Sequence, residues 1–346
     1  MTHFWVREEA RENETRVGVT PHGVRELIKA GHRVTVEDDP TRAIPTADYL
    51  ATGAEIVGAG TWVNAPLDAV ICGLKELPAD GTPLGHRHVM FGHAYKGQAD
   101  GAELLERFRV GGGTLLDLEY LTHANGRRVA AFGVWAGFAG AAVSLLAWAA
   151  NERGAPCPKA HVFASSDEMT QAVRRALGGA MPRVIVIGAL GRVGAGARDL
   201  CDRLGLQVTA WDVAETASGG PFPEILEHDV FLNCILASPG VPVFVPISAK
   251  EAPRQLRVIG DIACDPSSDF SPVKVYDHVT TWDAPVVRVH NAPSLDVMAI
   301  DNLPSMLPRE ASEDFADQLL EHLLGFETDE SGVWGRAIDK YREHVV

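Results

Sequence analysis

Short apolar runs in the first third of the sequence are each followed by charged side chains whose types suit proton transfer. A lysine beside a carboxylate and a histidine can shuttle protons near neutral pH when burial lowers the lysine pKa. If the runs are parallel strands, their carboxyl ends meet at one edge of a sheet, where ligands bind in open α/β folds. The sequence therefore predicts one edge that gathers Lys75, Glu76, His93, Lys96 and Glu119.

Cationic residues in the same part of the chain could hold an anionic substrate. Arg16 lies two positions after Glu14, just before a turn, and Arg127-Arg128 precedes a long apolar segment. A guanidinium forms a planar fork that matches a carboxylate. Taken singly, each of these charges, like those of the predicted edge, is also compatible with a solvated surface position.

A glycine-rich loop is the most readable motif. In residues 183–197, RVIVIGALGRVGAGA, a β-branched run leads into Gly188, Gly191 and Gly194. Glycines let a backbone turn tightly and approach a pyrophosphate at the N-terminus of the next helix. The spacing is G-x-x-G-x-x-G instead of the usual G-x-G-x-x-G.

An acidic residue strengthens the case for a dinucleotide. Asp212 closes the next apolar run, where a carboxylate would accept hydrogen bonds from the adenosine ribose hydroxyls. The same carboxylate would repel a 2′-phosphate, so NAD(H) is favoured over NADP(H). The alternative is a tight turn with an aspartate that only caps the following helix.

Strands alternating with helices indicate parallel sheets in both halves of the chain. In the first half we predict strands at 32–37, 68–74, 88–91 and 113–118, with helices at 25–31 and 102–108. In the second half we predict strands at 183–187, 207–211, 230–234, 257–262 and, as the last, 286–289. The tail from Pro308 has helical periodicity and is expected to return to the first domain.

One segment needs a decision between membrane and core. Residues 129–150 carry no charge and are long enough to span a bilayer. The segment is rich in alanine and glycine, and soluble α/β pattern lies on both sides of it. We expect a buried helix between two domains, with a membrane span as the alternative.

Composition narrows the function classes. The 346 residues include 31 basic and 46 acidic ones, a net charge of −15, which argues against nucleic acid or an anionic membrane as the main partner. The five scattered cysteines form no CxxC pair and suit a reducing compartment. The charged N-terminus has no signal-peptide core. His86, His88 and His93 lack acidic or cysteine partners at ligand spacing, so we expect no metal.

A series of motifs extends over nearly the whole length of the chain: GLKELP (73–78), GHAYKGQADGAELLERF (92–108), GGGTLLDLEYL (111–121), GRRVAAFGVWAGFAGAA (126–142), VIGALGRVG (186–194), ETASGGPF (215–222), NCI (233–235) and DNLPSMLPREAS (301–312). In these motifs the sequence resembles the NAD-dependent, lysine-forming saccharopine dehydrogenases. The N-terminal ENETRVGVTP (12–21) is also similar to the wider alanine dehydrogenase group.

The resemblance implies two Rossmann-like domains with an interdomain cleft. The substrate-side domain would comprise residues 1–131 and about 313–346, and the NAD-binding domain residues 132–312. The implied reaction interconverts saccharopine and NAD with L-lysine, 2-oxoglutarate and NADH. The implied partners are these small molecules alone, and we expect a cytoplasmic monomer.

The resemblance also assigns roles to residues. Lys75 and His93 would be the acid–base pair, with Glu76 and Glu119 tuning their pKa values. The implied substrate-binding residues are Arg16, Lys96, Arg128, Glu14 and Gln98. The implied cofactor-binding residues are Gly188, Leu190, Gly191, Arg192, Val193, Gly194, Asp212 and Asp301, the last at the head of the last helix.

Two features depart from the family or leave the substrate open. Val193 stands where some members have a cysteine that can pair with the cysteine of the NCI motif, Cys234 here, so that pair cannot form. The N-terminal motif is shared with alanine dehydrogenases, so a related opine-type or amino-acid dehydrogenase with another substrate pair is an alternative. A catalytically inactive NAD-sensing protein is a second alternative, which the intact Lys75 and His93 disfavour.

Overall fold

The computed structural model describes residues 1–11, 14–75, 77–97 and 100–345. The chain divides into two compact units. Unit 1 comprises Met1–Ala131 and Pro308–Val346, and unit 2 comprises Phe132–Leu307. The chain thus re-enters unit 1 at Pro308, where the sequence suggested a return at about 313.

Unit 1 is built on a six-stranded sheet of order β3-β2-β1-β4-β5-β6, in which every pair of neighbours is parallel. The strands are β1(His3–Val6), β2(Arg33–Glu37), β3(Glu55–Val57), β4(Val70–Cys72), β5(Arg87–Met90) and β6(Thr114–Asp117). The order reverses between β1 and β4, which makes that point the natural place for a ligand in a doubly wound sheet.

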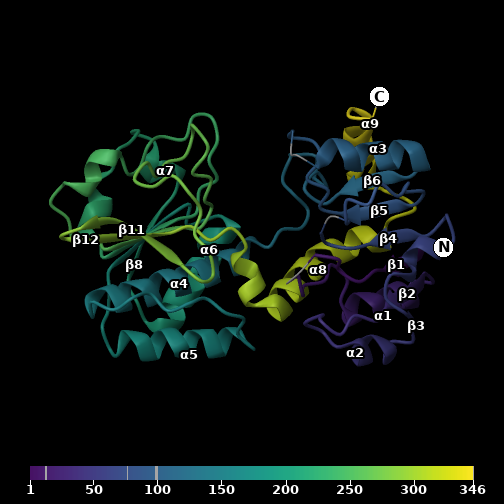
Figure 1. The fold of residues 1–346 in the computed structure, drawn as a ribbon, viewed down its shortest axis with the longest axis horizontal. Helices are drawn as coiled ribbons and strands as arrows, with labels where there is room; N and C mark the ends of the chain where they lie inside the picture. Colours follow the sequence, from purple (N-terminus) through teal and green to yellow (C-terminus); the bar gives the residue numbers. More distant parts are fainter. Residues whose placement is uncertain (12–13, 76, 98–99, 346) are drawn as a thin grey trace. The chain divides into compact units, whose positions relative to one another are not determined.

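Helices cover this sheet, two of them from the end of the chain. The helices of unit 1 are α1(Pro21–Lys29), α2(Thr46–Leu50), α3(Gly101–Gly111), α8(Pro308–Leu324) and α9(Val333–Arg342). Figure 1 shows the yellow C-terminal helices among the purple and blue elements of the unit. Ser312 of α8 accepts the backbone N–H of Val17 at 3.0 Å, and Tyr341 of α9 donates to the carbonyl of Gly113 at 3.1 Å.

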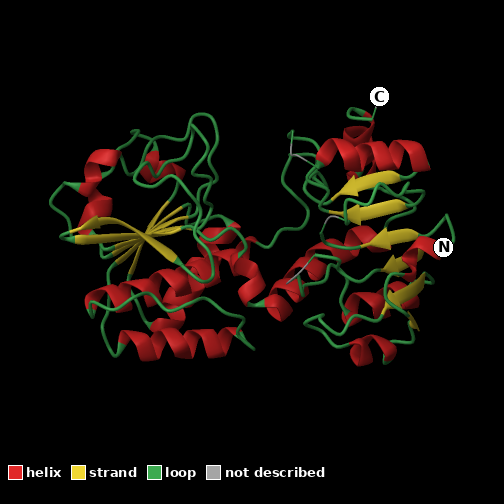
Figure 2. Cartoon of the chain, in the orientation of Figure 1, coloured by secondary structure: helices red, strands yellow, loops and turns green. Residues whose placement is uncertain are grey.

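Unit 2 has a second six-stranded sheet, of order β11-β12-β10-β9-β7-β8. The strands are β7(Val184–Ile187), β8(Val208–Trp211), β9(Val230–Asn233), β10(Val258–Asp261), β11(Val286–Asn291) and β12(Ser294–Met298). The helices are α4(Gly133–Glu152), α5(Ser166–Leu177), α6(Arg192–Leu204) and α7(Val213–Thr216). Figure 2 shows this sheet as a twisted fan with long helices on one side.

Each face of this sheet has its own core, as the alternation of side chains along a strand requires. Val184 and Val186 of β7 pack with the helical cluster that contains α4, α5 and α6. Ile185 and Ile187 of the same strand pack on the opposite face against Phe222 and other loop residues. The run RVIVI is apolar throughout because both of its faces are buried.

The segment predicted as a buried helix between two domains is buried, but it is the central helix of unit 2 itself. By length and composition alone, α4 could cross a bilayer, and it is the single such helix in the part of the chain described. Most of its residues are buried against α6, α5 and the sheet. Gly137 and Gly196 lie where helices α4 and α6 touch, and a Cβ at either would sit 1.8 Å from a backbone carbonyl oxygen.

The predicted parallel sheets are confirmed except at one edge, where the prediction that residues 286–289 form the last strand is wrong. Strand β11 pairs antiparallel with β12, which follows it and pairs parallel with β10. The hairpin turns at Ala292-Pro293, without the glycine or asparagine that marks a tight turn in sequence. Strands β1 and β3 and helices α5 and α9 were also not predicted individually.

Candidate active site and nucleotide loop

Three predicted site residues of unit 1 lie at the ends of three neighbouring strands. Lys75 follows β4, His93 follows β5 and Glu119 follows β6. Because β4, β5 and β6 are adjacent and parallel, their carboxyl ends meet at one edge of the sheet. The structure therefore places these three residues at one edge of the sheet. Glu76 and Gln98 lie outside the residues described.

Phe91 brings Lys75 and His93 into one neighbourhood. The ammonium nitrogen of Lys75 lies 6.0 Å from the centre of the Phe91 ring, at the limit of a cation–π contact. The His93 imidazole stacks on the same ring, with centroids 6.1 Å apart and an interplanar angle of 15°. Both side chains are partly buried. A lysine and a histidine that both approach one phenyl ring at a sheet edge are residue types that can exchange protons with a substrate bound there.

The backbone at His93 is in a conformation that side chains rarely adopt. Its φ angle is +48°, one of two such non-glycine positions among the residues described. The preceding Gly92 has no room for a side chain, because a Cβ there would lie 2.5 Å from Leu115. Backbone strain of this kind is concentrated at functional sites.

Lys96 and Glu119 form an ion pair at the outer part of this edge. Lys96 Nζ donates to Glu119 Oε1 at 2.6 Å, which raises the pKa of Lys96. Arg128 is exposed and close enough to lower that pKa in turn. The structure thus brings together two predicted substrate-binding cations and one predicted tuning carboxylate.

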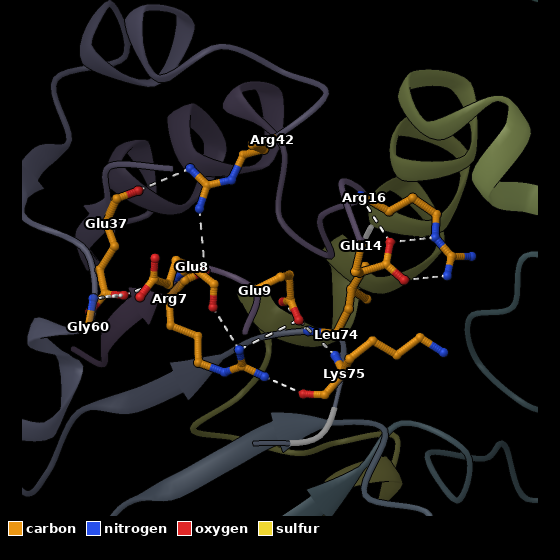
Figure 3. Close-up of polar contacts among 10 residues, drawn as sticks. All are labelled: Arg7, Glu8, Glu9, Glu14, Arg16, Glu37, Arg42, Gly60, Leu74 and Lys75. Atoms are coloured by element: carbon orange, nitrogen blue, oxygen red, sulfur yellow. Dashed lines mark hydrogen bonds and ion pairs between the residues drawn. The ribbon is translucent and has the colours of Figure 1, made fainter. Parts of the chain in front are cut away.

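Glu14 and Arg16 form a buried pair beside Lys75. Arg16 Nε and Nη2 donate to the two oxygens of Glu14 at 2.8 and 2.6 Å. Burial would raise the pKa of Glu14, but the hydrogen bonds and charge of Arg16 lower it below its usual value, with a further contribution from Lys75. The predicted substrate-binding arginine is therefore held in a fixed plane (Figure 3).

Sequence reasoning missed three residues that hold this edge in place. Asp117 ends β6 and accepts the backbone N–H of Glu119 at 2.9 Å and that of Gly92 at 3.3 Å. Arg7 and Glu9 follow β1 and contact the backbone around Lys75. Asp117 lies inside the quoted motif GGGTLLDLEYL, and a polar residue within an apolar strand was the signal that could have identified it.

Asp117 should make the stability of unit 1 depend on pH. Burial, the largest cause, raises the pKa of Asp117 to about 6. The unfolded carboxyl ionises near pH ~4, so between about pH 4 and 6 the unfolded chain binds fewer protons and unfolding becomes easier as pH rises. We expect Asp117→Asn to reduce this fall in the free energy of unfolding by up to about 3 kcal/mol.

Urea titrations at several pH values across this window measure the effect, with exposed Asp68→Asn as the matched control. An unchanged pH slope in Asp117→Asn would contradict the assignment.

The glycine loop of unit 2 has the compact geometry that a pyrophosphate site needs. Gly188 follows β7 with a φ angle of +86°, and a Cβ there would lie 2.7 Å from Ile235. A Cβ at Gly194 would lie 2.2 Å from the carbonyl oxygen of Gly188. Gly191 caps α6, so the backbone N–H groups that begin this helix follow the loop directly. This cradle fits a dinucleotide phosphate at the switch point between β7 and β9.

Asp212 both ties the loop and caps a helix. Its Oδ2 accepts the backbone N–H of Leu190 at 2.9 Å, and its Oδ1 accepts that of Val213 at 2.9 Å. It also forms a capping box with Glu215 on the short helix α7. The capping alternative is therefore present, and a carboxylate retains acceptor capacity for ribose hydroxyls beyond these two bonds.

The remaining predicted cofactor residues differ in position. Leu190 is exposed at the loop, and Arg192 and Val193 open α6. Val193 packs at the edge of the same core as Cys234, and all five cysteines are free. Asp301 does not stand at the head of the last helix: it is exposed in a turn before the 3-10 segment Leu303–Met306, within unit 2, and α8 begins only at Pro308.

The histidines considered as metal ligands have structural surroundings. His86 bonds the carbonyl of Ala65 at 3.1 Å, and His88 is enclosed by Trp62 and Phe108. Burial lowers the pKa of His88 well below its usual value, which favours the neutral ring. Within the described residues, no group of three or more His, Cys, Asp or Glu side chains could hold a metal ion.

Comparisons with known proteins agree with this architecture. Residues 5–139 match the family model of the N-terminal domain of alanine dehydrogenase/PNT. The solved structure of an L-alanine dehydrogenase superposes with a TM-score of 0.70 at 20% identity, covering 98% of this chain and 94% of the other, which shows a shared fold.

Curated relatives are much closer in sequence. The saccharopine dehydrogenase [NAD(+), L-lysine-forming] of Neurospora crassa is 44% identical over 359 residues, covering 99% of this chain and 96% of the relative. The protein of the same name from Schizosaccharomyces pombe is 41% identical over 361 residues, covering 99% and 98%. The chain therefore belongs to the family of NAD+-dependent, L-lysine-forming saccharopine dehydrogenases.

Proposed function

We propose that this chain joins L-lysine to 2-oxoglutarate with NADH as the reductant, and catalyses the reverse oxidation of saccharopine. The observation that carries the proposal is the convergence of Lys75, His93 and Glu119 at one edge of unit 1, in a chain 44% identical to a curated enzyme of that name. The proposal also rests on the glycine loop and Asp212 in unit 2.

The reaction needs two proton-transfer steps that the Lys75 and His93 side chains can supply. A neutral amine must attack the keto carbon, so a base has to accept the proton that the amine loses. The carbinolamine oxygen must then be protonated so that it leaves as water and an imine remains. NADH, when bound, supplies the hydride that reduces the imine carbon. We assign both proton steps to the Lys75–His93 pair. We further propose that Glu119 tunes the pKa values of these two side chains.

The substrate charges match the cations of unit 1. Saccharopine carries three carboxylates, and Arg16, Lys96 and Arg128 supply three positive groups near this edge. Glu14 orients the Arg16 guanidinium, whose fork has five donors. We infer that Arg16 receives a substrate carboxylate in that fixed plane, while Lys96 and Arg128 receive the others.

NAD(H) is the cofactor that the loop fits. The Gly188–Gly194 cradle would hold the pyrophosphate, and Asp212 would accept the ribose hydroxyls while repelling a 2′-phosphate. Leu190, Arg192 and Val193 line the start of α6 beside that cradle. We propose that these residues hold NAD(H) and discriminate against NADP(H).

Asp212→Ser should relax this cofactor preference. A serine still caps α7, but the negative charge that opposes a 2′-phosphate is gone. We expect the kcat/KM ratio of NADH over NADPH to fall by at least about tenfold, the effect of roughly 1.4 kcal/mol of repulsion. Steady-state kinetics with both cofactors measures the ratio, and Asp202→Ser on the exposed face of α6 is the control. An unchanged ratio would remove Asp212 from the discrimination.

Product identification tests the reaction itself. Purified protein is incubated with NADH and a panel of amines and 2-oxo acids, and the products are analysed by mass spectrometry. We expect one dominant product, with the mass of lysine plus 2-oxoglutarate minus water plus two hydrogens. A different pair as the preferred substrates would indicate an opine-type or amino-acid dehydrogenase. NADH binding without any product would indicate an NAD sensor.

We further propose a cytoplasmic monomer. Five free cysteines fit a reducing compartment. Size-exclusion chromatography with light scattering gives the mass in solution, and the mass of a dimer would contradict the proposed monomeric state.

A further inference from the structure

Both oxygens of the Glu9 carboxylate accept hydrogen bonds from the backbone at Lys75. Oε1 accepts the N–H of Leu74 at 2.6 Å, and Oε2 accepts the N–H of Lys75 at 2.9 Å. The side chain of Glu9 is only 5% exposed. Two consecutive N–H groups bound to one carboxylate fix the peptide planes at the turn after β4, and with them the direction in which the Lys75 side chain leaves the backbone.

Arg7 binds the same turn through the backbone carbonyl of Lys75 and pairs with Glu9. It is 1% exposed, its Nη1 lies 3.5 Å from Glu9 Oε2, and its Nη2 donates to the backbone carbonyl of Lys75. Nη1 also donates to the carbonyl of Glu8 at 2.7 Å. The peptide groups on both sides of the Lys75 α-carbon are therefore held by one buried ion pair, as Figure 3 shows.

Gly73 makes room for this arrangement. A Cβ at Gly73 would lie 2.4 Å from Arg7 Nε, so a larger residue would push the guanidinium away from the turn. Arg7 itself is anchored at its own backbone, where its carbonyl accepts Arg42 Nη2 at 3.3 Å. The small residue at Gly73 is therefore required for Arg7 to reach the backbone of Lys75.

Stability alone gives little reason to bury such a pair. Removing two charges from water costs about as much as their attraction returns, and an apolar replacement of similar volume is often as stable. A carboxylate with two backbone donors and an arginine with two backbone acceptors do, however, specify one backbone geometry. The residue at the centre of that geometry is Lys75.

We propose that the Arg7–Glu9 ion pair is a positioning device for the acid–base residue Lys75. The pair touches no reacting atom and acts by holding the turn from which Lys75 projects. The catalytic part of this inference rests on the proposed function, whereas the structural part concerns the Lys75 amine whatever the substrate.

Conservative variants test the positioning. Glu9→Gln keeps the shape but replaces one acceptor oxygen by a donor, which cannot bond a backbone N–H. Arg7→Lys keeps the charge but loses the fork. Arg107→Lys is the matched control, because Arg107 is 5% exposed and also bonds two backbone carbonyls, of Thr82 and Pro78, and a carboxylate, of Asp80. That arginine lies in the same unit, and its hydrogen bonds hold the backbone of Pro78 and Thr82, whereas those of Arg7 hold the backbone of Lys75.

Trace acetylation with acetic anhydride, read by peptide mass spectrometry, reports on the Lys75 amine without any turnover. We expect the labelling rate of Lys75 to change at least about threefold in Glu9→Gln and Arg7→Lys, because a released turn alters both the exposure of the amine and its pKa. Lys29, which is 77% exposed, serves as the internal reference in every sample. Arg107→Lys should leave Lys75 labelling unchanged.

Kinetics then tests the link to catalysis. We expect Glu9→Gln and Arg7→Lys each to lower kcat at least about tenfold, as small displacements of a catalytic group do. In the Lys75→Met background the same substitutions should cause no further loss, which is the non-additivity of residues that act through one another. Additive losses would show general structural damage and overturn the proposal.

Failure of the two proposals can be told apart. If the unchanged protein shows no turnover with lysine and 2-oxoglutarate, the proposed function fails, and Lys75 labelling still decides the positioning. If the labelling rate of Lys75 is the same in Glu9→Gln, Arg7→Lys and the unchanged protein, or if Arg107→Lys changes that rate as much as they do, the positioning role is wrong whatever the reaction.

Discussion

Lys75→Met is expected to lower kcat by about 10²–10⁴-fold, the usual contribution of a positioned acid–base group. Methionine fills a similar volume but cannot accept or donate the proton. The glycine loop belongs to unit 2, so the dissociation constant of NADH should stay within about twofold, a change of less than 0.5 kcal/mol. Steady-state kinetics and NADH fluorescence titration measure the two quantities.

Lys29→Met is the matched control for this prediction. Lys29 lies in the same unit, but its side chain is 77% exposed and its ion pair with Glu26 lies at the surface. The kcat of Lys29→Met should equal that of the unchanged protein. Wild-type turnover in Lys75→Met would remove Lys75 from the chemistry.

Gly194→Ala is expected to damage both the stability of unit 2 and its cofactor affinity. The new Cβ would lie 2.2 Å from the Gly188 carbonyl oxygen and 2.6 Å from the Ala189 α-carbon, so the loop and α6 must separate. Overpacking of this kind costs about 1–3 kcal/mol of unfolding free energy. If one charge-assisted hydrogen bond to the pyrophosphate is lost, NADH binds at least about tenfold more weakly.

Gly191→Ala is the stability control for the same loop. Gly191 has a φ angle of −75°, and a Cβ there would lie 3.5 Å from its nearest neighbour, the Gly188 carbonyl oxygen. Its unfolding free energy should change by less than about 1 kcal/mol. Urea titrations separate the two variants, and equal stability would show that Gly194 is not fixed by close packing.

The carboxyl-end edge could be predicted because its signal is local. Apolar runs end directly before Lys75, His93 and Glu119, and parallel strands must bring their ends to one edge. The glycine loop could be predicted for the same reason, since strand, glycines and helix follow one another in the chain. The family resemblance added roles to these residues that spacing alone does not assign.

The role of the Arg7–Glu9 ion pair could not be predicted because its contacts with the Lys75 backbone are long-range. Arg7 and Glu9 stand in a charged stretch that suggests a solvated surface, yet both are almost fully buried. Their partners, the backbone groups of Leu74 and Lys75, come from a different part of the chain. Only the pairing of β1 with β4 brings the two segments together.

Elements with weak local signals were missed for related reasons. Strand β1 is short and buried at every position, so it lacks the alternation that marks a half-exposed strand. Strand β12 follows a proline directly, which reads as a break in sequence. The resemblance places Asp301 at the head of the last helix, but a short 3-10 segment intervenes before α8.

The most direct test of the central claim is an omission assay. Purified protein is mixed with NADH, 2-oxoglutarate and L-lysine, the loss of NADH absorbance is followed, and each component is left out in turn. The account predicts that NADH is consumed only when all three are present. Consumption without lysine, or none at all while NADH still binds, would contradict the assignment of this chain as a saccharopine-forming enzyme.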